Sequence, residues 1–117
     1  MRRALLVDDD PLVRMVVAGI LDTLGFEVIE AEDGKEALAA LSAERGIDVL
    51  VTDVLMPRLD GWTLAEQARL AHPELPVIYV TGYYHENARP VPGGSVIRKP
   101  FRITKFAEVL GELLSAS

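Results

Sequence analysis

Cysteine is absent from the 117-residue sequence. Its absence excludes disulfide bonds, thiol nucleophiles and zinc–thiolate sites. Long hydrophobic runs are absent too: the apolar stretch Ala4–Val7 is followed by three aspartates and is too short for a signal peptide or a membrane span. Lys and Arg number 12 against 18 Asp and Glu, and the net charge of -6 argues against direct binding to nucleic acid or an anionic membrane. We expect a soluble, cytoplasmic protein.

The length and the hydrophobic content fit one compact domain over residues 1–117. Hydrophobic residues make up 50% of the chain and charged residues 26%, which is enough apolar material for a packed core. Five short β-type segments alternate with segments of helical periodicity. The predicted strands are Ala4–Val7, Glu27–Ala31, Val49–Thr52, Val77–Thr81 and Val96–Arg98, and the predicted helices are Pro11–Leu24, Gly34–Ala43, Thr63–Ala71 and Ile103–Leu114. This alternation predicts the α/β class, a parallel sheet with helices on both faces; an antiparallel α+β domain is the alternative.

Short polar residues mark the ends of the predicted helices. Asp10 precedes a proline and Asp33 precedes the second helix, so both aspartates are expected to cap helix N-termini. Gly25 is expected to end the first helix. Apolar residues of that helix fall on one broad stripe that is expected to face the core: Leu12, Val13, Val16, Val17, Ile20, Leu21 and Leu24.

The stretch between the fourth and fifth predicted strands interrupts the alternation. Pro90, Pro92 and two consecutive glycines leave only His85–Arg89 with helical potential. The fourth helix of the alternation is therefore predicted to be short, irregular or absent.

Polar residues collect where the predicted strands end, the edge at which ligands bind in open parallel sheets. These residues are Asp8, Asp9 and Asp10 after the first strand, Asp53 after the third, Thr81 at the end of the fourth and Lys99 after the fifth. The carboxylates would repel one another without a compensating cation. Oxygen ligands without nearby His or Cys suit Mg²⁺, which commonly accompanies phosphate.

The same group of residues suits phosphoryl transfer. Thr81 offers a hydroxyl and Lys99 an ammonium group to phosphoryl oxygens. Asp53 is alone at the end of the central buried strand, and a carboxylate can accept a phosphoryl group as an acyl phosphate. We therefore take Asp53 as the predicted acceptor.

Other polar and aromatic residues are interpreted as structural. Asp10 is expected to act only as a helix cap, and Asp60-Gly61 to form a turn. Trp62 is expected to pack in the core. His72 and His85 are expected to be exposed, because nothing in the sequence places them beside a nucleophile.

Four segments together resemble the receiver domain of two-component response regulators. They are Val7-Asp8-Asp9, the run from Asp53 to Gly61, Thr81-Gly82 and Lys99-Pro100-Phe101. Each is weak alone, but they occur in the family's order at the ends of the predicted strands, and the final helix completes the pattern. The resemblance implies a flavodoxin-like, doubly wound, three-layer fold with five parallel strands in the order 2-1-3-4-5.

The resemblance also implies a role for each polar residue at the strand ends. Asp53 is implied to be phosphorylated, Thr81 to be the switch hydroxyl and Lys99 to be the salt-bridge partner of the phosphoryl group. The implied Mg²⁺ ligands are Asp8, Asp9, Asp53 and the backbone carbonyl of Leu55. Pro100 resembles the family's proline after a cis peptide bond. The domain would catalyse its own phosphorylation and slow hydrolysis, as a switch rather than an enzyme.

The partners that the resemblance implies are proteins. The phosphoryl donor would be a sensor histidine kinase or a phosphotransfer protein, and small acyl-phosphate-like donors would also serve. A downstream target protein would bind the face around the fourth helix and the fifth strand, and a homodimer through that face is left open. The chain ends directly after its last helix, so we expect either a stand-alone receiver or one excised from a larger regulator or hybrid kinase.

Two features depart from the family's usual pattern. Val96 stands where the family has an aromatic residue coupled to the switch hydroxyl, so Tyr83 or Tyr84 would have to replace it. The segment from Thr81 to Lys99 is shorter than is usual in the family by about one helical turn. The run from Pro76 to Tyr83 resembles a variant subset, and we expect its fourth helix to be mobile and to order on phosphorylation or partner binding. Leu55 and Tyr83 are expected to restrict attacking water and lengthen the life of the acyl phosphate.

Two other functions fit the sequence less well. A Mg²⁺-dependent aspartyl-phosphate phosphatase of the haloacid-dehalogenase type has an Asp-x-Asp motif on its first strand, which Asp8 and Asp10 match formally. However, 117 residues leave no room for a cap domain, and Asp53 would have no role. A flavin-binding module of the same topology would need a hydroxyl- and glycine-rich loop after the first strand, which this sequence lacks.

Overall fold

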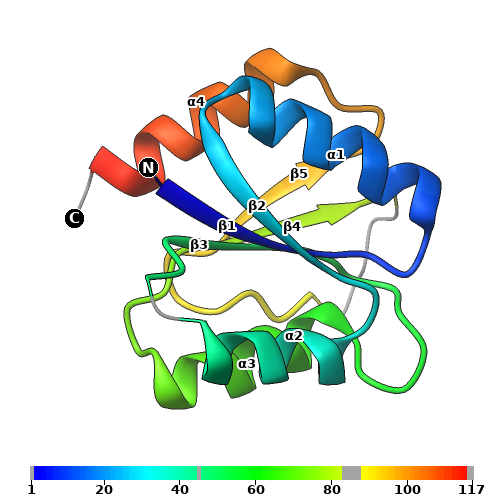
Figure 1. Ribbon diagram of the computed structural model, residues 1–117, viewed down its shortest axis with the longest axis vertical. Helices are drawn as coiled ribbons and strands as arrows, with labels where there is room; N and C mark the ends of the chain where they lie inside the picture. Colours follow the sequence, from blue (N-terminus) through cyan, green and yellow to red (C-terminus); the bar gives the residue numbers. More distant parts are fainter. Residues whose placement is uncertain (1, 45, 83–87, 116–117) are drawn as a thin grey trace.

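The computed structural model describes residues 2–44, 46–82 and 88–115, and within them the chain forms five strands and four helices. The strands are β1 (Arg2–Val7), β2 (Phe26–Ala31), β3 (Val49–Asp53), β4 (Val77–Thr81) and β5 (Ser95–Arg98). The helices are α1 (Pro11–Thr23), α2 (Gly34–Ala43), α3 (Gly61–Ala71) and α4 (Ile103–Ser115). All neighbouring strands are parallel, in the order β2-β1-β3-β4-β5 (Figure 1). The predicted α/β class and doubly wound strand order are confirmed.

Helices cover both faces of the sheet, with α1 and α4 on one face and α2 and α3 on the other (Figure 1). Alternate residues of a strand therefore enter different cores. On β1, Leu5 and Val7 join the core beneath α2 and α3, whereas Ala4 and Leu6 join the core beneath α1 and α4. None of these four is more than 2% exposed, as expected for a strand covered on both faces.

The predicted caps of the first two helices are confirmed. The Asp10 carboxylate accepts hydrogen bonds from the first turn of α1, and the Asp33 carboxylate accepts one from the first turn of α2. Gly25 follows α1 with a φ of 93°, a conformation that favours glycine, so the predicted stop is confirmed as well.

Several predicted element ends differ from the observed ones by one or two residues. The clearest case is α3, which begins at Gly61 rather than Thr63. The Asp60 carboxylate accepts the Thr63 N–H at 2.8 Å and caps the helix. Asp60 therefore starts a helix rather than only closing a turn, and the first helical turn includes the two residues that the prediction left out.

Helix α1 buries a narrower stripe than predicted. Val17 and Leu21 are buried, but Leu12, Met15 and Val16 are 69%, 64% and 52% exposed. The other five residues of the predicted stripe are buried or packed against the core, but the expectation that Leu12 and Val16 face the core is wrong, because these two residues lie at the edge of the stripe that the sheet does not cover. None of the helices in the described ranges combines the length and apolar character needed to cross a bilayer.

Residues 88–94 lie between β4 and β5, where no helix occurs in the described part of the chain. The predicted helical stretch His85–Arg89 falls mostly outside the described residues, and residues 88–90 have no regular secondary structure. Val91 is buried in the core beneath α2 and α3, and its N–H donates to the Tyr79 hydroxyl at 3.0 Å. Tyr79 is fully buried on β4 and lies against Trp62, with 4.4 Å between ring centroids. The 88–94 segment is therefore anchored in the core.

Two arginines also attach the 88–94 segment to α3. Arg69 on α3 donates to the Pro92 carbonyl at 3.0 Å. In the opposite direction, Arg89 donates to the Glu66 carboxylate and to the Thr63 hydroxyl of α3, both at 3.1 Å. The segment thus covers the sheet through side-chain contacts instead of through a helix of its own.

Tyr79→Phe should lower the free energy of unfolding by about 1–2 kcal/mol, because the buried Val91 N–H loses its acceptor. Urea unfolding followed by the fluorescence of Trp62, the single tryptophan, measures this loss. Thr23→Val is the matched control: it removes an exposed hydrogen bond from Thr23 to the Gly19 carbonyl (2.9 Å), which water replaces, at a cost below about 0.5 kcal/mol. Equal losses in the two variants would contradict the anchoring role of Tyr79.

Candidate functional site

Three aspartates converge at the carboxyl end of the sheet. Asp8 and Asp9 directly follow β1, and Asp53 ends the neighbouring strand β3. Val7 pairs with Thr52, so the two strands end side by side, and their following loops lie at the same end of the molecule (Figure 1). One carboxylate oxygen from each aspartate lies within 4.8 Å of the others. Of the four aspartates expected at the strand ends, the structure brings together Asp8, Asp9 and Asp53, and Asp10 caps α1.

Asp8 is the buried member of this acidic group, with 3% of its surface exposed. Its N–H donates to the Ala31 carbonyl at the end of β2 (3.2 Å), and its carboxylate accepts the Asp10 N–H (2.9 Å). Burial raises the pKa of the Asp8 carboxyl to about 6, and the neighbouring carboxylates add to the rise. The hydrogen bond from Asp10 and the positive charge of Lys99 oppose it. Asp8 is thus held in one orientation at an electrostatic cost.

Asp53 is partly buried at the end of the central strand. Its carboxylate accepts the Val54 N–H at 2.7 Å. Burial raises the pKa of the Asp53 carboxyl, and the charge of Lys99 together with the N–H groups of Val54 and Leu55 opposes that rise. Backbone donors therefore orient the carboxylate, while its position at the strand end leaves it accessible to a ligand.

Helix α3 begins in contact with the backbone of Asp53. The Gly61 N–H donates to the Val54 carbonyl at 2.9 Å, and a side-chain carbon added at Gly61 would overlap the Asp53 carbonyl oxygen. That neighbour is backbone and cannot rotate away, so glycine is required here. The sequence of the Asp60-Gly61 pair predicts only a turn and does not reveal this close approach, because the packing of α3 against β3 is a tertiary contact. A glycine at the first helical position was the available signal.

Thr81 and Lys99 lie at the ends of the next two strands. Thr81 ends β4 and is 3% exposed. Lys99 follows β5, and its backbone N–H donates to the Thr81 carbonyl at 2.9 Å. The positive charge of Lys99 lowers the pKa of both Asp8 and Asp53, against the effect of burial. The Lys99–Pro100 peptide bond is cis, as the resemblance implies.

The other residues singled out from the sequence lie around this site or away from it. Trp62 is buried and His72 is exposed, which confirms both expectations. Leu55 is 47% exposed after β3, and Val96 is 39% exposed on β5. Three residues lie outside the described part of the chain, and their expected roles stay predictions: Tyr83, Tyr84 and His85.

The donor atoms of the acidic group fit a hard divalent cation. Asp8, Asp9 and Asp53 offer oxygen ligands, and neither His nor Cys belongs to this group. Mg²⁺ is bound by oxygen ligands and keeps part of its water shell, which suits a group of carboxylates that is buried at Asp8 and exposed at Asp9. A bound cation would also relieve the repulsion that contributes to the raised pKa of Asp8.

Comparison with known sequences identifies one family. The model of the response regulator receiver domain matches residues 4–110. The chain is 37% identical over 115 residues to the sensor kinase CckA of Brucella abortus, a match that covers 94% of this chain and 12% of that protein. It is 29% identical over the whole of both chains to the response regulator receiver protein CpdR of the same organism. The chain spans 12% of the length of the first curated relatives that it matches.

Solved structures agree with this match. The crystal structure of the response regulator protein TrrA from Thermotoga maritima, in complex with Mg(2+)-BeF, superposes with a TM-score of 0.88 at 28% identity. The similarity covers 97% of this chain and 100% of that one.

Asp8→Asn should stabilise the metal-free protein in a pH-dependent way. The folded-state pKa of Asp8 is about 6 and the ordinary value is about 4, so the stability that this group contributes is fully present below about pH 4 and is lost as the pH rises through about 6. We expect the variant to gain about 2 kcal/mol in unfolding free energy at pH 8 and little at pH 4. Urea unfolding in EDTA measures both values.

The exposed Asp22 on α1 provides the control for this experiment. Asp22→Asn makes the same chemical change away from the acidic group and should show no comparable gain at pH 8. A gain for Asp8→Asn that is equal at the two pH values would contradict the role of the buried charge.

Proposed function

Because the chain belongs to the response regulator receiver domain family, we propose that it is the phosphoryl-accepting switch of a two-component or phosphorelay system, with Asp53 as the acceptor. The N–P bond of a phosphohistidine on a sensor histidine kinase or phosphotransfer protein breaks, and an Asp53 carboxylate oxygen forms the new P–O bond. The histidine nitrogen of the donor recovers a proton. The observation that carries this proposal is the position of Asp53 at the end of the central strand, oriented by backbone N–H groups and flanked by two further carboxylates.

Asp8, Asp9, Asp53 and the Leu55 carbonyl are the proposed Mg²⁺ ligands. The mutual proximity of the three carboxylates supports this assignment, as does the Mg²⁺ complex of the related protein TrrA. When bound, Mg²⁺ would neutralise charge on the carboxylates and the transferring phosphoryl group. The protein's own contribution is to hold the acceptor in place: Asp8 is buried and hydrogen-bonded, and α3 packs against the Asp53 backbone.

Lys99 and Thr81 are the proposed contacts of the phosphoryl group. The positive charge of Lys99 favours the ionised forms of Asp8 and Asp53, and phosphorylation of Asp53 would add nearly two negative charges at the same place. Thr81 ends the strand next to β3, and its hydroxyl is the proposed donor that moves onto a phosphoryl oxygen. Phosphorylation would favour the conformation with this contact and thereby alter the surface around β5 and the 88–94 segment, where a downstream protein binds.

The phosphatase alternative is not favoured by the surroundings of Asp8. In that mechanism Asp8 would be the nucleophile, yet it is 3% exposed and its carboxylate accepts the Asp10 N–H. Asp10, the second aspartate of the motif, accepts hydrogen bonds from the first turn of α1 as its cap. Neither carboxylate is arranged for attack on an external substrate.

Asp53→Asn should abolish Mg²⁺-dependent, acid-labile incorporation of phosphate from a small acyl-phosphate donor, because an amide oxygen is a poor nucleophile. Intact-protein mass spectrometry and radiolabelling measure the incorporation. Asp22→Asn, an exposed change outside the site, should leave it unchanged. Labelling that persists in Asp53→Asn and disappears in Asp8→Asn would instead support the phosphatase mechanism.

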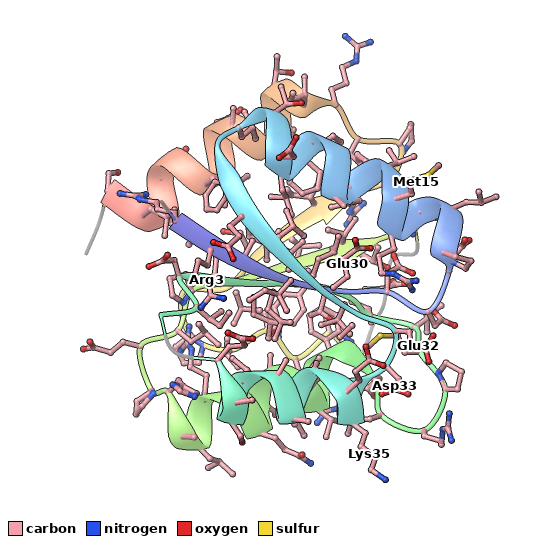
Figure 2. The ribbon with its side chains drawn as sticks, viewed as in Figure 1. Arg3, Met15, Glu30, Glu32, Asp33 and Lys35 are labelled. Atoms are coloured by element: carbon pink, nitrogen blue, oxygen red, sulfur yellow. The ribbon has the colours of Figure 1, made fainter. Side chains whose placement is uncertain are left out.

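The phosphoryl donor is proposed to dock on the exposed apolar residues of α1. Leu12, Met15 and Val16 are each more than half exposed, and they lie in the first two turns of the helix that begins directly after the acidic loop (Figure 2 labels Met15). A protein that brings a phosphohistidine to Asp53 must cover surface beside that loop. We propose that a helical, apolar surface of the donor packs on these three residues.

Met15→Glu should slow phosphotransfer from a purified phosphorylated histidine kinase by at least about tenfold, because it places a charge in the apolar contact. The same variant should retain the wild-type rate with a small acyl-phosphate donor, which needs no docking surface. Leu70→Glu is the control: Leu70 is 84% exposed on α3, and its replacement should affect neither rate. Unchanged kinase transfer in Met15→Glu would contradict docking on α1.

A further inference from the structure

Arg14, in the second turn of α1, contacts the loop that carries Asp8 and Asp9. Its Nη1 donates to the Asp8 backbone carbonyl at 2.7 Å, and its Nε lies 3.2 Å from the Glu30 carboxylate on β2. The Arg14 side chain is 19% exposed, so these contacts are partly shielded from water. No pattern in the sequence points to a role for Arg14 or Glu30.

These contacts close a ring between β1, α1 and β2. The Asp8 N–H donates to the Ala31 carbonyl, and Ala31 follows Glu30 on β2. Arg14 returns from α1 to the carbonyl of the same Asp8 and to Glu30, whose side chain lies between β2 and α1 in Figure 2. The backbone of Asp8 therefore has two partners, Ala31 for the N–H and Arg14 for the carbonyl, and one oxygen of its carboxylate accepts the Asp10 N–H.

We infer that Arg14 is a positioning residue for the phosphoryl-acceptor site, which fixes the loop of Asp8 and Asp9 so that their carboxylates face Asp53. This inference rests on the proposed function. The regular β1–β2 pairing ends at Val7 and Ala31, so the Asp8 carbonyl lies beyond the pairs of the sheet. The planar guanidinium of Arg14 binds this carbonyl and the Glu30 carboxylate at the same time. Two contacts fix the loop relative to β2 better than one contact would.

The charge of Arg14 and the contacts that Arg14 makes have opposite effects on the strength of cation binding. A positive charge near Asp8 repels Mg²⁺, so its removal alone would strengthen cation binding. Loss of the ring frees the loop and weakens binding, as loss of groups that orient metal ligands generally does. A test must therefore remove the ring without changing the net charge.

The double variant Arg14→Met with Glu30→Gln meets this requirement, because it removes one positive and one negative charge. Arg3→Met with Glu44→Gln is the matched control: Arg3 is similarly shielded (23% exposed) and binds Glu44 at 2.9 Å, but it lies at the opposite end of β1 (Figure 2 labels Arg3). Isothermal titration calorimetry gives the Mg²⁺ dissociation constant, and the rate with a small acyl-phosphate donor gives phosphorylation. Circular dichroism identifies a temperature at which all variants are folded.

We expect the Arg14/Glu30 variant to bind Mg²⁺ about tenfold more weakly than the wild type and the Arg3/Glu44 variant to bind it within twofold. Arg14→Lys keeps the charge without the planar fork, and should weaken binding by at least about threefold. This second variant tests the inference if the double variant does not fold. Wild-type affinity in Arg14→Lys and in the folded double variant would overturn the inference and leave the proposed function intact. A wild-type protein that neither binds Mg²⁺ nor becomes phosphorylated would overturn the proposed function itself.

Discussion

Asp8, Asp9 and Asp53 each place a carboxylate oxygen within 4.8 Å of the others, and the rest of the site depends on this crowding of negative charge. Two unit charges about 4 Å apart repel by ~1 kcal/mol in water and by ~4 kcal/mol near a protein surface. A flexible loop would relieve the repulsion by moving apart. Here the apolar residues of β1 and β3 are buried on both faces of the sheet and the two strands are paired, so the strand ends cannot separate, and the repulsion stays available to favour a bound cation.

Helix α3 links the Asp53 backbone to the 88–94 segment. Helix α3 begins at Gly61 against the Asp53 backbone, and its Thr63 and Glu66 side chains accept hydrogen bonds from Arg89. The 88–94 segment is also attached to β4, the strand that ends in the proposed switch residue. A movement of the end of β4 toward Asp53 would therefore reach the 88–94 segment through β4. The contacts of Arg89 with α3 link the same segment to the Asp53 backbone. In the described part of the connection between β4 and β5, residues 88–94 are irregular but anchored in the core.

The alternation of strands and helices predicts the fold class and the polar strand ends predict the acidic group, the family resemblance implies the strand order, and some side chains are misplaced. Leu12 and Val16 were assigned to the core because helical periodicity identifies an apolar stripe without showing how wide a strip the sheet covers. The start of α3 was placed at Thr63, two residues late, because the cap formed by Asp60 was read as a turn. The role of Arg14 is not visible in the sequence for a similar reason. Its partner Glu30 is distant along the chain, and its contact with Asp8 is made to the backbone carbonyl, so no sequence pattern marks either contact.

Local chemistry was therefore determined by the sequence alone: aspartates and glycine at the helix ends, apolar runs that form buried strands, and the polar residues that follow each strand. These features depend on neighbours a few residues apart, and their periodicity is visible in the chain. Tertiary structure alone decided the contacts between distant segments, namely the close approach of Gly61 to the Asp53 backbone, the hydrogen bond from Val91 to Tyr79 and the ring closed by Arg14. Such contacts depend on the relative rotation and translation of packed elements, which side-chain order along a chain does not specify.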